Sequence, residues 1–143
     1  MRSQVLVDTG VLVALIDRSD RYHAWASQKS MEIVPPLLTC EAVISESWFL
    51  LGRVRNGRET LLRFLMLKQV QVCFDLDQEL GKVVALLDRY ASVPVSLADA
   101  ELVRMAELYP QSMVFTLDSD FQVYRKDRDR TISVLSPWSE NLE

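Results

Sequence analysis

Short apolar runs of strand character alternate with helical patterns along the whole chain. Five runs are predicted as strands, near residues 4–8, 36–39, 70–74, 113–117 and 131–135. The segments between them predict helices near residues 10–17, 21–31, 40–56, 58–68, 76–90 and 97–108. This order predicts an α/β fold in which helices cover both faces of a parallel sheet.

The chain is predicted to form one domain. It has 143 residues, 49% of them hydrophobic, which is enough to bury a core without disulfides or a structural metal. The sequence has no internal repeat, low-complexity segment or linker. We expect residues 1–137 to form the domain and the polar residues 138–143 to be a frayed tail.

Composition predicts a cytoplasmic protein. Cys40 and Cys73 lie in apolar segments without metal-binding spacing, which predicts buried free thiols and no zinc site. The first residues lack the features of a signal or transit peptide, and no apolar run is long enough to span a membrane. The net charge of −4 is the wrong sign for holding nucleic acid by overall charge alone.

Two aspartates follow apolar strands near opposite ends of the sequence. Asp8 follows the strand run that begins at Gln4, and Asp118 follows the run 113–117. In open α/β sheets, ligands bind at the carboxyl ends of the strands. We therefore expect both aspartates to face one cleft.

Two further acids, Glu46 and Asp99, interrupt the apolar faces of predicted helices. The residues at helical spacing from them are apolar: Ala42, Val43, Phe49 and Leu50 for the first, and Leu102, Val103 and Ala106 for the second. Both carboxylates are therefore predicted to point toward the core side of their helices. An ionised carboxylate is almost never buried unless it is paired or binds a metal. Four converging acids thus predict a divalent cation site.

Each acid also has an ordinary structural explanation. The two strand-end aspartates could be turn residues or helix N-caps. Glu46 could pair with Arg53, and Asp99 could cap the helix that begins near Ser96. The four acids together favour a site more strongly than any one of them alone.

A cluster of carboxylates supports a narrow range of chemistry. Oxygen-only ligands suit Mg²⁺ or Mn²⁺, which are commonly held by one or two carboxylates together with substrate phosphate oxygens. Such a metal activates water and stabilises a leaving oxygen, so the predicted substrate is a phosphate ester. The sequence has no Walker, GxGxxG or GxSxG motif. Its single histidine, His23, is far from any acid motif, which excludes a catalytic triad or a histidine-rich metal site.

Four segments carry a family resemblance: VLVDTGVLVALID, TCEAVISESWFLLGR, YASVPVSLADAELVRMAE and TLDSDF. In this order, and over nearly the whole chain, they resemble the PIN-domain nucleases, in particular toxins of VapC type. The resemblance implies a three-layer α/β/α fold with a central, mainly parallel sheet of about five strands. It also implies an Mg²⁺- or Mn²⁺-dependent endoribonuclease that hydrolyses RNA phosphodiester bonds, often forms a homodimer, and often has a small antitoxin protein encoded beside it.

The resemblance also implies an acidic site on particular residues of this chain. The family's first three acids fall on Asp8, Glu46 and Asp99, of which Asp8 and Asp99 are expected to ligate the metal. The fourth acid lies in TLDSDF, where both Asp118 and Asp120 fit and Asp118 is preferred.

Four other residues of these motifs also bear on the predicted site. Glu41 is a rival to Glu46, but its neighbours at helical spacing make the weaker case for a core-side carboxylate. Thr9 and Thr116 match small hydroxyl positions near the family's site, where they would help to bind substrate. Ser96 stands where many relatives carry a further acid.

Two clusters of basic residues stand out along the chain, one from Arg53 to Arg63 and one from Arg125 to Arg130. Either group could be a solvated face, because acids accompany both. We expect Arg53 and Arg55 to contact RNA, since they follow the Glu46 helix and lie beside a predicted turn. The consecutive apolar residues 48–51 predict that part of this helix faces a second copy of the chain.

Two other classes of function stay open. One is a PIN-fold module with weak catalysis that acts by binding protein or RNA. The other is a phosphohydrolase or receiver-like domain that uses a strand-end aspartate as nucleophile or phosphate acceptor. Gly10 stands where such a phosphatase would carry a second acid, and the chain lacks the acidic pair of a receiver.

Overall fold

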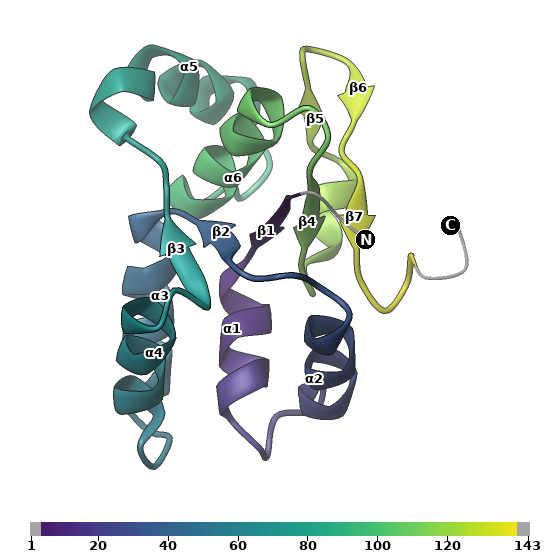
Figure 1. Cartoon of the computed structure of the whole chain (residues 1–143). Helices are drawn as coiled ribbons and strands as arrows, with labels where there is room; N and C mark the ends of the chain where they lie inside the picture. The colour runs from purple at the N-terminus through teal and green to yellow at the C-terminus, as the bar shows by residue number, and fades with distance from the viewer. Residues whose placement is uncertain (1–3, 140–143) are drawn as a thin grey trace.

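The computed structural model describes residues 4–139, and its centre is a five-stranded sheet (Figure 1). The strand order is β3-β2-β1-β4-β7, and every neighbouring pair is parallel. The strands are β1 (Val5–Val7), β2 (Leu37–Thr39), β3 (Val70–Val72), β4 (Met113–Phe115) and β7 (Val134–Leu135). This confirms the predicted parallel sheet and its three-layer α/β/α class.

Helices connect the strands and cover both faces of the sheet. They are α1 (Thr9–Ile16), α2 (His23–Met31), α3 (Glu41–Leu51), α4 (Gly57–Met66), α5 (Leu76–Arg89) and α6 (Leu97–Leu108). In Figure 1, α5 and α6 form one group above the sheet, and α1 to α4 extend below it. Within residues 4–139, none of the helices has the length and apolar character that crossing a membrane requires.

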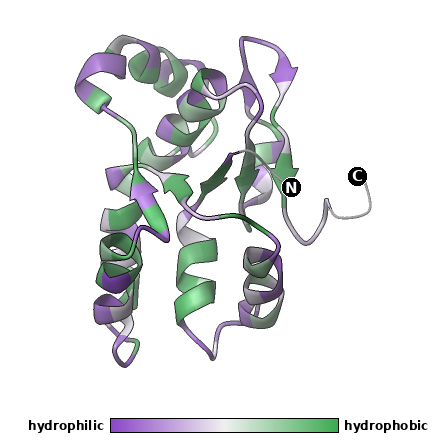
Figure 2. Ribbon diagram, in the orientation of Figure 1, coloured by the Kyte–Doolittle hydropathy of each residue, from purple (hydrophilic) through white to green (hydrophobic). Residues whose placement is uncertain are grey.

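The central strands hold the core. All three residues of β1 and of β4 are buried, as expected for strands that helices cover on both faces. Figure 2 shows the strongest hydrophobic colour on the central strands, and a paler green over most of α1, which continues directly from β1. Because β1 and β4 are adjacent and parallel, the segments that follow them emerge at the same edge of the sheet.

The structure differs most from the sequence prediction in two regions, the connection between α3 and α4 and the last predicted strand. The helix predicted over 40–56 ends at Leu51, and α4 begins at Gly57. A side chain at Gly57 would meet the Leu51 carbonyl oxygen at 2.9 Å, so glycine permits this close turn. The predicted last strand is split between β6 (Arg130–Thr131) and β7. The former pairs with β5 (Arg125–Lys126) in a separate hairpin that was not predicted.

The predicted C-terminal tail is described only in part. Ser139 is buried, and its hydroxyl accepts a hydrogen bond of 2.8 Å from the Ser136 hydroxyl. Residues 140–143 lie outside the described residues. Both predicted free thiols are present: Cys40 is buried and Cys73 is half-buried.

Candidate metal centre

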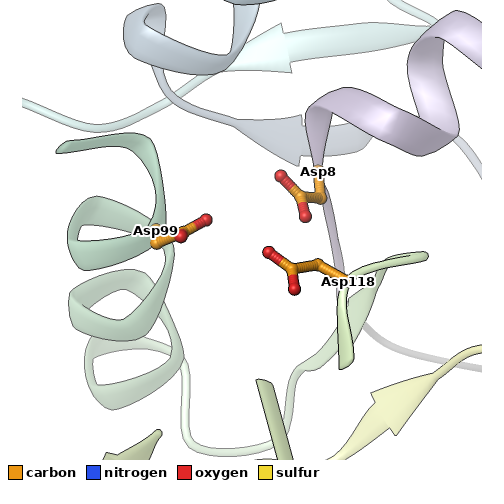
Figure 3. Close-up of side chains that lie close together, drawn as sticks. All are labelled: Asp8, Asp99 and Asp118. Carbon is orange, nitrogen blue, oxygen red and sulfur yellow. The ribbon is translucent and has the colours of Figure 1, made fainter. Parts of the chain in front are cut away.

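Three aspartates from three elements meet beside the sheet edge. One carboxylate oxygen from each of Asp8, Asp99 and Asp118 lies within 4.8 Å of the others. Asp8 joins β1 to α1, Asp99 lies in the first turn of α6, and Asp118 follows β4. Figure 3 shows Asp99 pointing from α6 toward the other two carboxylates. The predicted convergence is therefore present for three of the four acids.

Each of these aspartates is also a helix cap. The Asp8 carboxylate accepts a hydrogen bond from the backbone N–H of Thr9 at 2.7 Å, and this contact caps α1. Asp118 caps the 3₁₀ helix η1 (Ser119–Gln122). Asp99 forms a capping box with Ser96 at the start of α6. The capping explanations and the cluster are thus both correct, because one carboxylate has enough acceptor sites for both.

Two hydroxyl groups fix the orientation of the carboxylates. Thr116 donates to Asp8 Oδ2 at 2.7 Å, and its hydroxyl oxygen accepts the backbone N–H of Asp118 at 2.9 Å. This one side chain therefore ties together the segments that carry two of the aspartates. Tyr124 donates to Asp99 Oδ2 at 3.0 Å and was not predicted. Burial raises the pKa of Tyr124, so its hydroxyl stays protonated and acts as a donor.

The cluster is electrostatically costly without a cation. Burial raises the pKa of Asp8 to about 7, and the charges of Asp99 and Asp118 add to this effect against opposing hydrogen bonds. Burial likewise raises the pKa of Asp99, again helped by the charge of Asp118. Among residues 4–139, no lysine, arginine or histidine forms an ion pair with any of the three.

The donor set fits a hard divalent cation. All three side chains offer carboxylate oxygens, which are preferred ligands of Mg²⁺ and Mn²⁺. A cation between them would offset both the burial and the mutual repulsion of the charges. The three aspartates could therefore hold one ion and leave further coordination positions for water or substrate oxygens.

Glu46 lies outside this cluster. We predicted that its carboxylate points toward the core, and this was wrong, because the residue is exposed. Helix α3 instead buries Val43, Ser47 and Leu51, which are spaced four residues apart and form one stripe along the helix. Glu46 lies beside this stripe. Glu46 still has a link to the site, since the Thr9 hydroxyl donates to its Oε1 at 2.8 Å. The rival Glu41 is exposed as well.

The two late acids have different positions. Asp118 belongs to the cluster, whereas Asp120 does not. The backbone N–H of Asp120 donates to Asp118 Oδ1 at 2.9 Å, so Asp120 stays close behind it. The structure therefore agrees with the preference for Asp118 as the acid that faces the other two.

Arg53 and Arg55 lie at the other end of α1 from Asp8. They are exposed and line a pocket of about 850 Å³ together with Asp17, Arg18 and other residues around the carboxyl end of α1. The eight residues of α1 span about 12 Å, and the two arginines are separated from the aspartates by about this length. The two arginines and the acidic cluster are therefore separate features of the surface.

A further buried acid was not singled out from the sequence. Glu101 is only 3% exposed, and burial raises its pKa, opposed by a hydrogen bond with the Cys40 thiol. It lies two residues beyond Asp99 on α6, but it is not part of the cluster. The sequence did not single out Glu101, because most residues of α6 are buried and the apolar neighbours of Glu101 therefore do not mark one face of the helix.

The sequence and the fold correspond to a known family of domains. The PIN domain family model matches residues 5–127, and the chain belongs to this family. Among solved structures, the crystal structure of Mycobacterium tuberculosis VapC20, a sarcin–ricin loop cleaving toxin, is similar with a TM-score of 0.74. The match has 22% sequence identity and covers 84% of this chain and 94% of that one, which shows a shared fold. No curated protein matches the sequence.

Proposed function

We propose that this protein is a metal-dependent endoribonuclease that hydrolyses RNA phosphodiester bonds. The observation that carries the proposal is the cluster of Asp8, Asp99 and Asp118 at the carboxyl edge of a parallel sheet, where no basic side chain of residues 4–139 pairs with the three carboxylates. Membership of the PIN domain family and the similarity to a toxin that cleaves the sarcin–ricin loop support it. By the same similarity, we propose that it is the toxin of a type II toxin–antitoxin pair and acts in the cytoplasm.

Each acid has a proposed part in the reaction. Asp8, Asp99 and Asp118 would hold Mg²⁺ or Mn²⁺, which when bound lowers the pKa of water and stabilises the leaving oxygen. Glu46 and Asp120 would stand at the edge of the site, where a carboxylate can accept a proton from the attacking water. Thr9 would hold Glu46 in place through its hydrogen bond.

The substrate would extend beyond the cluster. Arg53 and Arg55 are proposed to contact RNA phosphates several nucleotides from the cleaved bond, because they lie about one α1 length away. Thr116 is buried and would act on the substrate through Asp8, whose carboxylate it orients.

The test is cleavage of RNA by purified protein with Mn²⁺, Mg²⁺ or EDTA. We expect cleavage with either metal and none with EDTA. Asp8→Asn and Asp118→Asn should each lower the rate by at least a hundredfold while the proteins remain folded. The matched control is Asp77→Asn, an exposed aspartate on α5, which should cleave like the unaltered protein.

Two outcomes would favour other functions. RNA binding without cleavage at any metal concentration would favour a PIN-fold binding module. Hydrolysis of small phosphate esters in place of RNA would favour a phosphohydrolase with a strand-end nucleophile such as Asp8. The antitoxin proposal has its own test: a small protein encoded by the neighbouring reading frame should co-purify with the chain and inhibit cleavage.

A further inference from the structure

Asp99 is fixed by a side chain from outside its own helix. The Tyr124 hydroxyl donates to Asp99 Oδ2 at 3.0 Å, and the tyrosine is 0% exposed. The same oxygen is 3.4 Å from the backbone nitrogen of Ser96, which is long for a hydrogen bond. Tyr124 therefore provides the shorter of the two contacts that hold this oxygen.

The two carboxylate oxygens of Asp99 differ in their hydrogen bonds. Oδ2 is taken by Tyr124 and Ser96, whereas Oδ1 accepts no hydrogen bond from the part of the chain that the structure describes. Figure 3 shows the Asp99 carboxylate directed across the gap toward Asp8 and Asp118. Rotation of the carboxylate would break the contact with the buried hydroxyl, so Tyr124 restricts the directions in which Asp99 can offer an oxygen.

The tyrosine ring is itself held on two sides. Phe121 packs against it edge to face with centroids 5.2 Å apart, and Tyr90 does so at 5.1 Å. The Tyr90 hydroxyl is engaged elsewhere, since it accepts the backbone N–H of Arg125 at 2.7 Å. The Tyr124 hydroxyl thus acts from a fixed position, which a flexible surface donor would not offer.

We propose that Tyr124 is a positioning residue that orients Asp99 for binding of the divalent cation. This inference rests on the proposed function, because it takes the three aspartates as the metal ligands. Groups that hydrogen-bond a metal ligand from behind typically change metal affinity by about ten- to a hundredfold when they are removed. Tyr124 has this relation to Asp99, as Thr116 has to Asp8.

The experiment compares two buried tyrosines that differ in what their hydroxyls contact. Tyr124→Phe keeps the ring and its two edge-to-face contacts but removes the donor to Asp99. Tyr90→Phe makes the same chemical change in the adjoining ring but removes only a contact to backbone. Binding of Mn²⁺ to each protein without RNA is followed by the electron paramagnetic resonance signal of the free ion.

We expect Tyr124→Phe to weaken Mn²⁺ binding by about tenfold or more and Tyr90→Phe to leave it unchanged. RNA cleavage by Tyr124→Phe should need correspondingly more Mn²⁺, and most of kcat should return at saturating metal. Thermal unfolding in EDTA identifies any loss of folded protein in either variant.

Three results would overturn the inference. Unchanged Mn²⁺ binding by folded Tyr124→Phe would show that the hydroxyl does not orient Asp99. Equal weakening in both variants would show a general effect of the aromatic cluster. If the unaltered protein binds no Mn²⁺, the inference fails together with the proposed metal site. In the first two results the unaltered protein still binds Mn²⁺ and cleaves RNA, so they remove the inference alone.

Discussion

At the scale of single residues, the burial of Asp8 opposes the charge that its proposed role as a metal ligand requires. Its side chain is 6% exposed, caps α1 and accepts a hydrogen bond from Thr116, yet its charge is opposed by burial and by two neighbouring aspartates. Such a conflict persists when the charged form is needed for binding. The cost of holding that charge is measurable in the metal-free protein.

We predict that the metal-free protein becomes less stable as the pH rises from about 4 to about 7. In this window the folded state keeps a proton on Asp8, whose pKa is raised from 3.8 to about 7, while the unfolded chain has released it. The folded state therefore binds more protons, and its free energy of unfolding falls with pH by at most about 4 kcal/mol. The raised pKa of Asp99 acts in the same direction. Urea unfolding in EDTA across this range measures the slope.

Asp8→Asn is the matched variant for this measurement. It should flatten the slope and be as stable as the unaltered protein, or more so, at pH 7. Added Mn²⁺ should raise the melting temperature of the unaltered protein by mass action and have little effect on the variant. Strong destabilisation by Asp8→Asn at pH 7 would mean that the hydrogen bond from Thr116 to Asp8 Oδ2, which an asparagine NH₂ group cannot accept, outweighs the cost of the Asp8 charge.

At the scale of elements, the turn between α3 and α4 carries the arginines proposed to hold RNA. Replacing Arg53 and Arg55 by alanine should weaken RNA binding several-fold and reduce its dependence on salt, because each phosphate contact releases counterions. Both residues are exposed, so the fold should be unaffected. Arg128→Ala with Arg130→Ala is the control pair, since the β5–β6 hairpin also carries aspartates. The affinity for RNA is measured as a function of salt concentration for both double variants, with Mn²⁺ present. Equal effects of the two double variants would contradict the proposed contact of RNA with Arg53 and Arg55.

Periodicity predicted the elements well but not always the face that each one buries. Asp8 and Asp118 were predictable because parallel strands share a carboxyl edge, whatever the details of packing. The orientation of Glu46 was not, since α3 is apolar on two sides and only the assembled fold decides which side is covered. The role of Tyr124 had no local signal, because its partner Asp99 is 25 residues away in the sequence. The β5–β6 hairpin was missed because its strands have only two residues each.

At the scale of the whole molecule, we predict association through the exposed side of α3. Trp48 is 40% exposed and Phe49 is 76% exposed, whereas Leu51 in the same apolar run is fully buried. Phe49→Glu should therefore leave the fold intact but shift a dimer toward monomer in sedimentation at micromolar concentration. Leu80→Glu, at a 49% exposed position on α5, is the control and should not change the mass. A monomer in the unaltered protein at this concentration would remove the dimer proposal.

The hydrogen bond from Thr116 to Asp8 joins residues that are 108 positions apart in the sequence. Strand β1 likewise pairs with β4, which is formed by residues made more than a hundred positions later. A chain still being synthesised therefore has only Asp8 of the three aspartates until residue 99 has been added, and the cluster cannot close before Asp118 is available. Closure of the site must therefore follow synthesis of strand β4, and N-terminal fragments that end before Asp118 would lack it.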